Sequence, residues 1–142
     1  MAEGDFTLSN KFKNEMANAD TDLAASSFKI ALIGSGTPNI DTSEFWDDLS
    51  AGDIVASGYT ADGQALASLS VTRDDTNDWS IWDFTDPSWA SLATATITYA
   101  VIYRNTGVAS TSPIVGWIEI ATNSNGNDYT VQLPVGGILR VA

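Results

Sequence analysis

The sequence predicts an all-β fold: an antiparallel β-sandwich, jelly-roll-like, or a barrel, with about seven to eight strands and a short N-terminal helix. Residues 94–103 are rich in β-branched and aromatic side chains that alternate, as in a half-buried strand. Turn-forming pairs such as Asp62-Gly63 and Asn125-Gly126 separate the apolar runs. No helical period lies between the later runs, which disfavours a fold of alternating strands and helices.

The first segment has a helical period instead. Leu8, Phe12 and Met16 fall close to one helical face. Thr7 is a suitable N-cap, so we expect a helix over residues 8–19. Its apolar face either docks on the sheet of its own domain or packs on a neighbouring subunit.

The length of 142 residues fits one domain. We expect residues 1–142 to form it, with residues 1–26 as an N-terminal helical arm and residues 27–142 as a β-rich body. A brief helical turn starting at Thr42 or Ser43 is expected between the first two strands. The predicted strands cover residues 28–32, 54–59, 67–71, 79–84, 94–103, 114–120, 129–133 and 138–141.

Alternation assigns the faces of two strands. Tyr99, Val101 and Tyr103 are predicted to point into the core. In the strand at residues 114–120, the even-numbered residues share one face and Trp117 lies on the other.

The charge balance excludes several partners. Six Lys and Arg stand against eighteen Asp and Glu, which gives a net charge of −12. A nucleic-acid-binding protein needs a basic stripe, and an anionic membrane surface would repel this chain, so we expect neither partner. The acidic residues near the N-terminus and the lack of a long apolar run predict no export signal and no membrane span.

The chain has no Cys and no His, which removes thiolate chemistry, disulfides and the commonest general base. Asp83 and Asp86, near Trp82 and Trp89, are the best candidates for the carboxylate pair of a glycosidase. Acids in such turns more often cap the backbone, so we expect no enzyme. Ser35 in Gly34-Ser35-Gly36 matches neither a nucleophile elbow nor a phosphate loop.

Two acidic or amide-rich runs could hold a calcium ion, although neither matches the EF-hand spacing and both are typical of β-turns. We expect no metal and no cofactor. The two runs are Asp74, Asp75, Asn77 and Asp78, and Asn123, Asn125, Asn127 and Asp128.

Core packing explains most of the five Trp residues. An exposed Trp89 or Trp117 would instead be a contact anchor, since interfaces are rich in Trp. The predicted interface residues are Leu8, Phe12, Met16 and Trp117.

Short motifs along nearly the whole chain resemble a family of small virion structural proteins of tailed bacteriophages. The resemblance depends on their order and spacing, because each motif alone is unspecific. The motifs are FTLSNKFK at residues 6–13, SEFWDDL at 43–49, GYTADGQ at 58–64, TND at 76–78, YAVIY at 99–103 and GILRV at 137–141.

The resemblance implies a non-enzymatic virion protein, made in the host cytoplasm, and a head decoration or cement protein in particular. Its expected partners are the major capsid protein or other virion proteins, together with further copies of itself, a trimer being favoured. A tail-fibre or other tail component and a carbohydrate-binding module are the alternatives, and an exposed Trp in a groove would favour the last.

Overall fold

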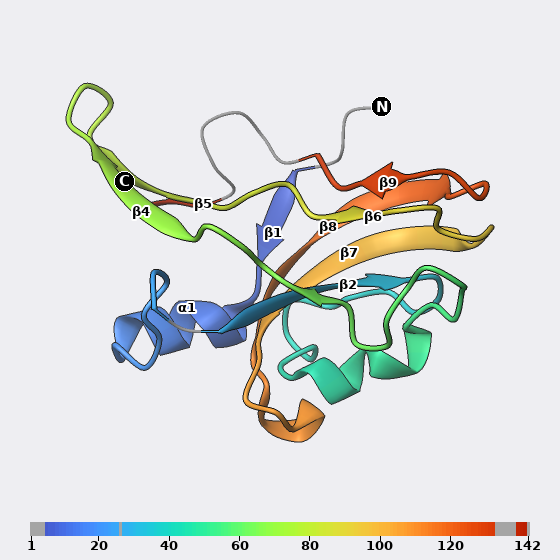
Figure 1. Ribbon diagram of the computed structural model, residues 1–142. Coiled ribbons are helices and arrows are strands. Elements are labelled where there is room, and N and C mark those ends of the chain that lie inside the picture. The colour runs from blue at the N-terminus through green and yellow to red at the C-terminus, as the bar shows by residue number, and fades with distance from the viewer. Residues whose placement is uncertain (1–4, 26, 133–138, 142) are drawn as a thin grey trace.

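The computed structural model describes residues 5–25, 27–132 and 139–141 (Figure 1). It is mostly β, with 37% strand and 13% helix, so the all-β, sandwich-like prediction is confirmed, and the sheets formed by the described residues do not close into a barrel. The elements of the described residues are β1 (Phe6–Leu8), α1 (Asn10–Ala17), β2 (Phe28–Ile33), η1 (Trp46–Asp48), η2 (Ser50–Gly52), β3 (Gln64–Ala65), β4 (Ser70–Asp74), β5 (Trp79–Asp83), β6 (Ser88–Trp89), β7 (Thr96–Arg104), η3 (Ala109–Thr111), β8 (Ile114–Asn123), β9 (Tyr129–Thr130) and β10 (Leu139–Val141), where η marks a 3-10 turn.

The body is built on a five-stranded antiparallel sheet in the order β1-β8-β7-β2-β3. Strands β10, β5 and β4 form a second sheet, and β6 pairs with β9. The β4–β5 hairpin projects from the body, as Figure 1 shows. The first sheet therefore forms the body, and the second sheet packs on it through Trp82 of β5 while its β4–β5 hairpin projects beyond it.

Both faces of the five-stranded sheet are buried. On one face Phe28, Ile30 and Leu32 of β2 join a large core with the N-terminal helix and β5. On the other face Ala31 and Ile33 of the same strand join a second core beneath the 3-10 turns. Phe28, Ile30 and Leu32 therefore share one face of β2, and the strand has apolar residues at successive positions because both faces of the sheet are covered.

The expected burial of Val101 and Tyr103 is confirmed, since 0% and 2% of their surfaces are exposed, while Tyr99 is half-buried. The pairing of β7 with β8 shifts register between Ile97 and Tyr99, and again between Ile102 and Tyr103. Each irregularity interrupts the alternation, as a β-bulge does.

The second register shift also changes the faces of β8. Ile114 lies in the second core with Trp117, whereas Val115 lies in the first core with Ile118. The prediction that all even-numbered residues of this strand share a face is therefore wrong at Ile114. An extra residue on one strand reverses the alternation beyond it.

The N-terminal helix starts later than predicted. Residues 6–8 pair with β8, and the helix begins only at Asn10. Ser9, not Thr7, is the N-cap: its hydroxyl accepts from the backbone N–H of Phe12 at 3.0 Å and donates to the carbonyl of Ile114. Pairing with β8 gives Leu8 a strand partner that a local helical pattern cannot reveal.

The predicted turns are confirmed at both turn-forming pairs. Asp62 and Gly63 have φ of 65° and 79°, and Asn125 and Gly126 have φ of 56° and 77°. The predicted strand over residues 54–59 is wrong.

After the bridge between Asp53 and Ile33, the chain leaves the sheet and turns at Gly58, whose φ is 86°. That conformation ends extended structure. Residues 133 and 138 of the last two predicted strands lie outside the described residues.

Candidate functional site

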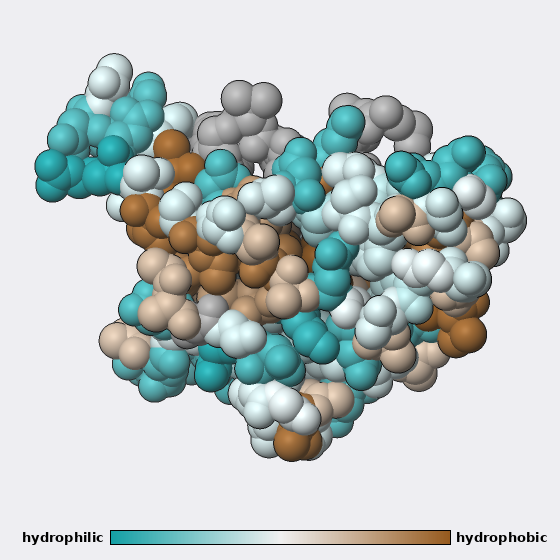
Figure 2. All heavy atoms as spheres, in the orientation of Figure 1, coloured by the Kyte–Doolittle hydropathy of each residue, from teal (hydrophilic) through white to brown (hydrophobic). Residues whose placement is uncertain are grey.

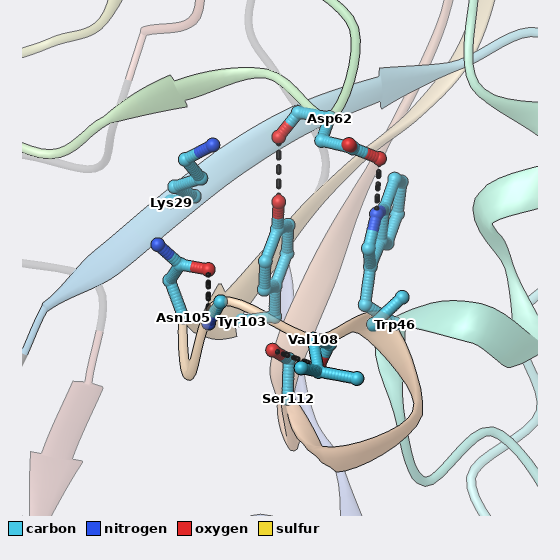
Figure 3. Close-up of a pocket in the computed structure, with 9 residues that line it drawn as sticks. Lys29, Trp46, Asp62, Tyr103, Asn105, Val108 and Ser112 are labelled. Carbon is cyan, nitrogen blue, oxygen red and sulfur yellow. Dashed lines mark hydrogen bonds between the residues drawn. The ribbon is translucent and has the colours of Figure 1, made fainter.

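A polar hollow of about 170 Å³ lies at one end of the five-stranded sheet, on the face of the second core (Figure 3). Lys29 of β2 and Tyr103 of β7 are direct cross-strand partners, so their side chains share this face. The loops around η1 and η3 and the Asp62 turn complete the wall. The lining residues are Lys29, Trp46, Asp62, Tyr103, Asn105, Gly107, Val108, Ala109 and Ser112.

Two stacked aromatic rings form the rigid part of this site. The rings of Trp46 and Tyr103 lie 4.8 Å apart between centroids, with an angle of 5° between their planes. The indole N–H of Trp46 donates to the Asp62 carboxylate at 2.8 Å, and the Tyr103 hydroxyl donates to the Asp62 carbonyl at 2.6 Å. Asp62 therefore fixes both rings from above, as Figure 3 shows.

The Asp62 turn is itself held by a half-buried carboxylate. Asp53 accepts from the Tyr59 hydroxyl at 2.6 Å and from the backbone N–H of Asp62 at 2.7 Å. Burial raises the pKa of Asp53, against the lowering effect of the Tyr59 hydrogen bond. Burial, and then the bond to Asp53, raises the pKa of Tyr59. Burial also raises the pKa of Tyr103, so both hydroxyls stay protonated donors.

Several polar groups of the hollow have unused hydrogen-bonding capacity. The Lys29 ammonium makes no ion pair and no hydrogen bond with the residues that the structure describes. The Asn105 side chain accepts from the Gly107 N–H at 3.1 Å through its oxygen, which leaves its amide N–H₂ to the hollow. One carboxylate oxygen of Asp62 accepts from Trp46, and the second oxygen makes no hydrogen bond with the residues that the structure describes.

The acidic residues considered as catalytic or calcium-binding groups accept hydrogen bonds from residues close to them in the sequence. Asp83 accepts from the backbone N–H of Phe84 at 2.9 Å. Asp74 accepts from the backbone of Thr76 and Asn77, and from the Asn77 amide and Trp79 indole. The Asn77 amide, first among these donors, holds the pKa of Asp74 below its usual value.

The second candidate calcium run is similar. Asn123 accepts from the backbone N–H of Asn125 at 3.0 Å, and Asp128 accepts from that of Ser91 at 2.8 Å. Across residues 5–25, 27–132 and 139–141, no group of three or more acidic side chains is placed to hold a metal. Ser35 lies in an exposed bend after β2.

Four of the five Trp side chains are buried: Trp46, Trp82, Trp89 and Trp117. Trp79, the fifth, is half-buried and lines a shallow hollow of about 270 Å³ on the β4–β5 hairpin. The ring faces of the buried four are thus largely used in packing.

The predicted interface residues do not share one exposed surface. Phe12 is 0% exposed and Trp117 is 6% exposed, so both contribute to the cores. Leu8 and Met16 are half-buried against the first core. The interface prediction stays a prediction, and among its residues Leu8 and Met16 have surface available.

The N-terminal helix is tied to the body by a partly buried ion pair. Glu15 accepts from the Arg104 guanidinium at 2.9 Å, and its carboxylate lies 3.7 Å from the Lys11 ammonium. Thr21 donates to the same carboxylate at 2.9 Å. Because Phe12 also enters the first core, the helix packs as part of the body.

An exposed apolar surface lies elsewhere, between the projecting hairpin and α1 (Figure 2). Val71 of β4 is 48% exposed, and Leu69 just before it is half-buried. Met16 of α1 and Leu23 after it are half-buried on the helix side. We call these four residues the hairpin-base patch.

Sequence reasoning did not find the polar hollow. Its charged residues, Lys29 and Asp62, come from separate segments, and Asn105 follows a third. One signal was present: Lys29 is the single charged residue of the otherwise apolar strand β2. A strand buried on both faces has no solvent side for a charge, so that residue marks an opening in the packing.

Comparison of the chain with protein-family models, curated proteins and solved structures gave no match. None of the helices in the described residues has the length and apolar character needed to cross a membrane.

Proposed function

We propose that this chain is a non-enzymatic structural protein of a tailed-phage virion, a head decoration protein that binds and stabilises the capsid lattice. Its partners are the major capsid protein or other virion proteins, and further copies of itself in a trimer. The sequence motifs described above suggest this role, and the hairpin-base patch is the observation that carries it.

The patch has the features of a protein contact surface. Val71 lies on β4, an edge strand among the described residues that is exposed over most of its length, so both its apolar side chain and the backbone groups of the outer edge are available there. Exposed apolar surface of this kind, bordered by polar residues, is typical of interaction sites. Asp74, Asp75 and Asp78 at the hairpin tip supply an acidic border, which favours a partner with basic residues around an apolar contact.

The charge of the chain makes the contact depend on burial. At a net charge of −12, identical subunits repel one another at long range. A desolvated apolar contact can overcome this repulsion, since a stable interface buries roughly 800 Å² per partner and apolar area contributes about 25 cal/mol per Å² before association costs.

Co-sedimentation with phage heads that lack this chain tests the proposal. We expect the protein to bind the heads, and binding to hold or strengthen as salt is raised, because salt screens the repulsion between acidic subunits. Val71→Asp should abolish binding, because it places a charge in the apolar contact. Thr72→Asp is the matched control, since Thr72 is exposed on the opposite face of the same strand.

Melting curves of both variants should match the parent, so that loss of binding reports the contact and not the fold. Failure of the parent protein to bind the heads, or equal binding by Val71→Asp, would contradict the proposal. Dissociation on modest salt addition would also count against it, because it would indicate an electrostatic interface.

A further inference from the structure

The polar hollow beside the Trp46–Tyr103 stack presents donors and an acceptor together. The Lys29 ammonium, the Asn105 amide N–H₂ and the second carboxylate oxygen of Asp62 make no hydrogen bond or ion pair with the described residues. Figure 3 shows Lys29 and Asn105 on the side of the Tyr103 ring that faces away from Trp46. Lys29 and Asn105 are half-buried and Asp62 is exposed at the rim, so a ligand with hydroxyl groups of its own can reach all three.

We propose that this hollow binds a neutral hexopyranose unit of a glycan. Sugar hydroxyls both donate and accept, so different hydroxyls of one ring can bond the Asp62 carboxylate and the Lys29 ammonium. The aliphatic side chain of Val108, which is 55% exposed, suits the C–H face of the ring. This inference concerns a different surface from the hairpin-base patch and does not depend on the proposed virion role.

Charge selects the neutral ligand over a charged one. An anion would meet Lys29 but also the Asp62 carboxylate, in a chain of net charge −12. A cation would meet Asp62 but also the Lys29 ammonium. A polyol uses both groups without placing a like charge beside either.

Size restricts the ligand to one sugar ring. The hollow has a volume of about 170 Å³. Pockets for drug-sized ligands span roughly 300–1,000 Å³, so this hollow takes one ring and leaves the rest of a glycan in solvent.

NMR titration of the full chain tests the proposal, with the methyl glycosides of glucose, galactose, mannose and N-acetylglucosamine as probes. We expect at least one glycoside to shift the Trp46 indole N–H and the Asn105 side-chain amide in a saturable way. Lys29→Met and Asp62→Asn should each weaken that binding about tenfold or more, the effect of losing one charge-assisted hydrogen bond. Asp62→Asn keeps an oxygen for the Trp46 indole and suits the positive φ of this position.

Lys13→Met is the matched control, because Lys13 is an exposed lysine on α1 outside the hollow. It should bind as the parent does. The proposal is overturned if none of the four glycosides shifts these signals, or if both hollow variants bind as the parent does. It is also overturned if sodium acetate shifts the signals through Lys29 while the glycosides do not, since the hollow would then be an anion site.

Discussion

Strands β7 and β4 both contain β-branched residues in antiparallel sheets, yet they have opposite surroundings. Val101, Ile102 and Tyr103 of β7 are at most 2% exposed, because both faces of the five-stranded sheet are covered. In β4, residues 70–73 are all exposed, and Val71 is 48% exposed. β-branched strand composition therefore indicates local structure, while the layers around a strand decide whether it stabilises the fold or is available for contact.

The most direct test of this comparison is to replace a valine by aspartate in each of the two strands. Val101→Asp should prevent folding, because an unpaired buried charge costs several kcal/mol or forces a large pKa shift. Val71→Asp should change the free energy of unfolding by about 0.5 kcal/mol or less, as exposed substitutions usually do. Circular dichroism melting curves check both, and a cooperative, parent-like melt of Val101→Asp would refute the assigned burial.

The N-terminal segment gives the next largest effect. Phe12→Ala should lower the free energy of unfolding by about 3–5 kcal/mol, the usual cost of removing a buried Phe side chain. Lys13→Ala, the exposed neighbour, should change it by about 0.5 kcal/mol or less. Denaturant titration measures the difference. Equal stability of the two variants would mean that the helix is a detachable arm.

Because the N-terminal helix packs on the body, deleting it cannot separate an effect on binding from an effect on folding. Removing residues 1–19 takes away β1, Phe12 and the Glu15–Arg104 ion pair together. We expect such a deletion to destabilise the body, so loss of particle binding by a truncated chain would not locate the interface. Single substitutions in the hairpin-base patch avoid this problem.

Local chemistry made some features predictable. The pairs at Asp62-Gly63 and Asn125-Gly126 form turns because these residues tolerate positive φ. This tolerance is a property of the residues themselves and does not depend on contacts with distant segments. The identity of β7 followed from its own composition. The class of fold followed from such segments and from the turns between them.

The features that sequence reasoning missed depend on contacts between distant segments. Pairing of β1 with β8 moved the helix start to Asn10. Register shifts in β7 and β8 moved Ile114 to the second core. The polar hollow needed Lys29 and Asp62 to meet, and nothing in either segment alone encodes that meeting.

The smallest expected effect is the pH dependence of stability that the half-buried Asp53 causes. Its raised pKa means that the folded state favours the protonated carboxyl. The stability from Asp53 is therefore fully present below its ordinary pKa of 3.8 and is lost as pH rises through the raised folded-state value. The free energy of unfolding of the parent, relative to Asp53→Asn, should fall as pH rises across this window. A difference that is constant or rises with pH would contradict the assigned burial.

Amide hydrogen exchange tests the central claim most directly, because it compares the two regions in one experiment. In the free protein, amides of β2 and β7 should exchange only through global unfolding, and those of β4 should exchange much faster. On phage heads, β4 should gain protection while β2 and β7 stay unchanged. Protection of β4 equal to that of β7 in the free chain, or no gain on the particle, would contradict an account in which the central sheet holds the fold and the hairpin region makes the contact.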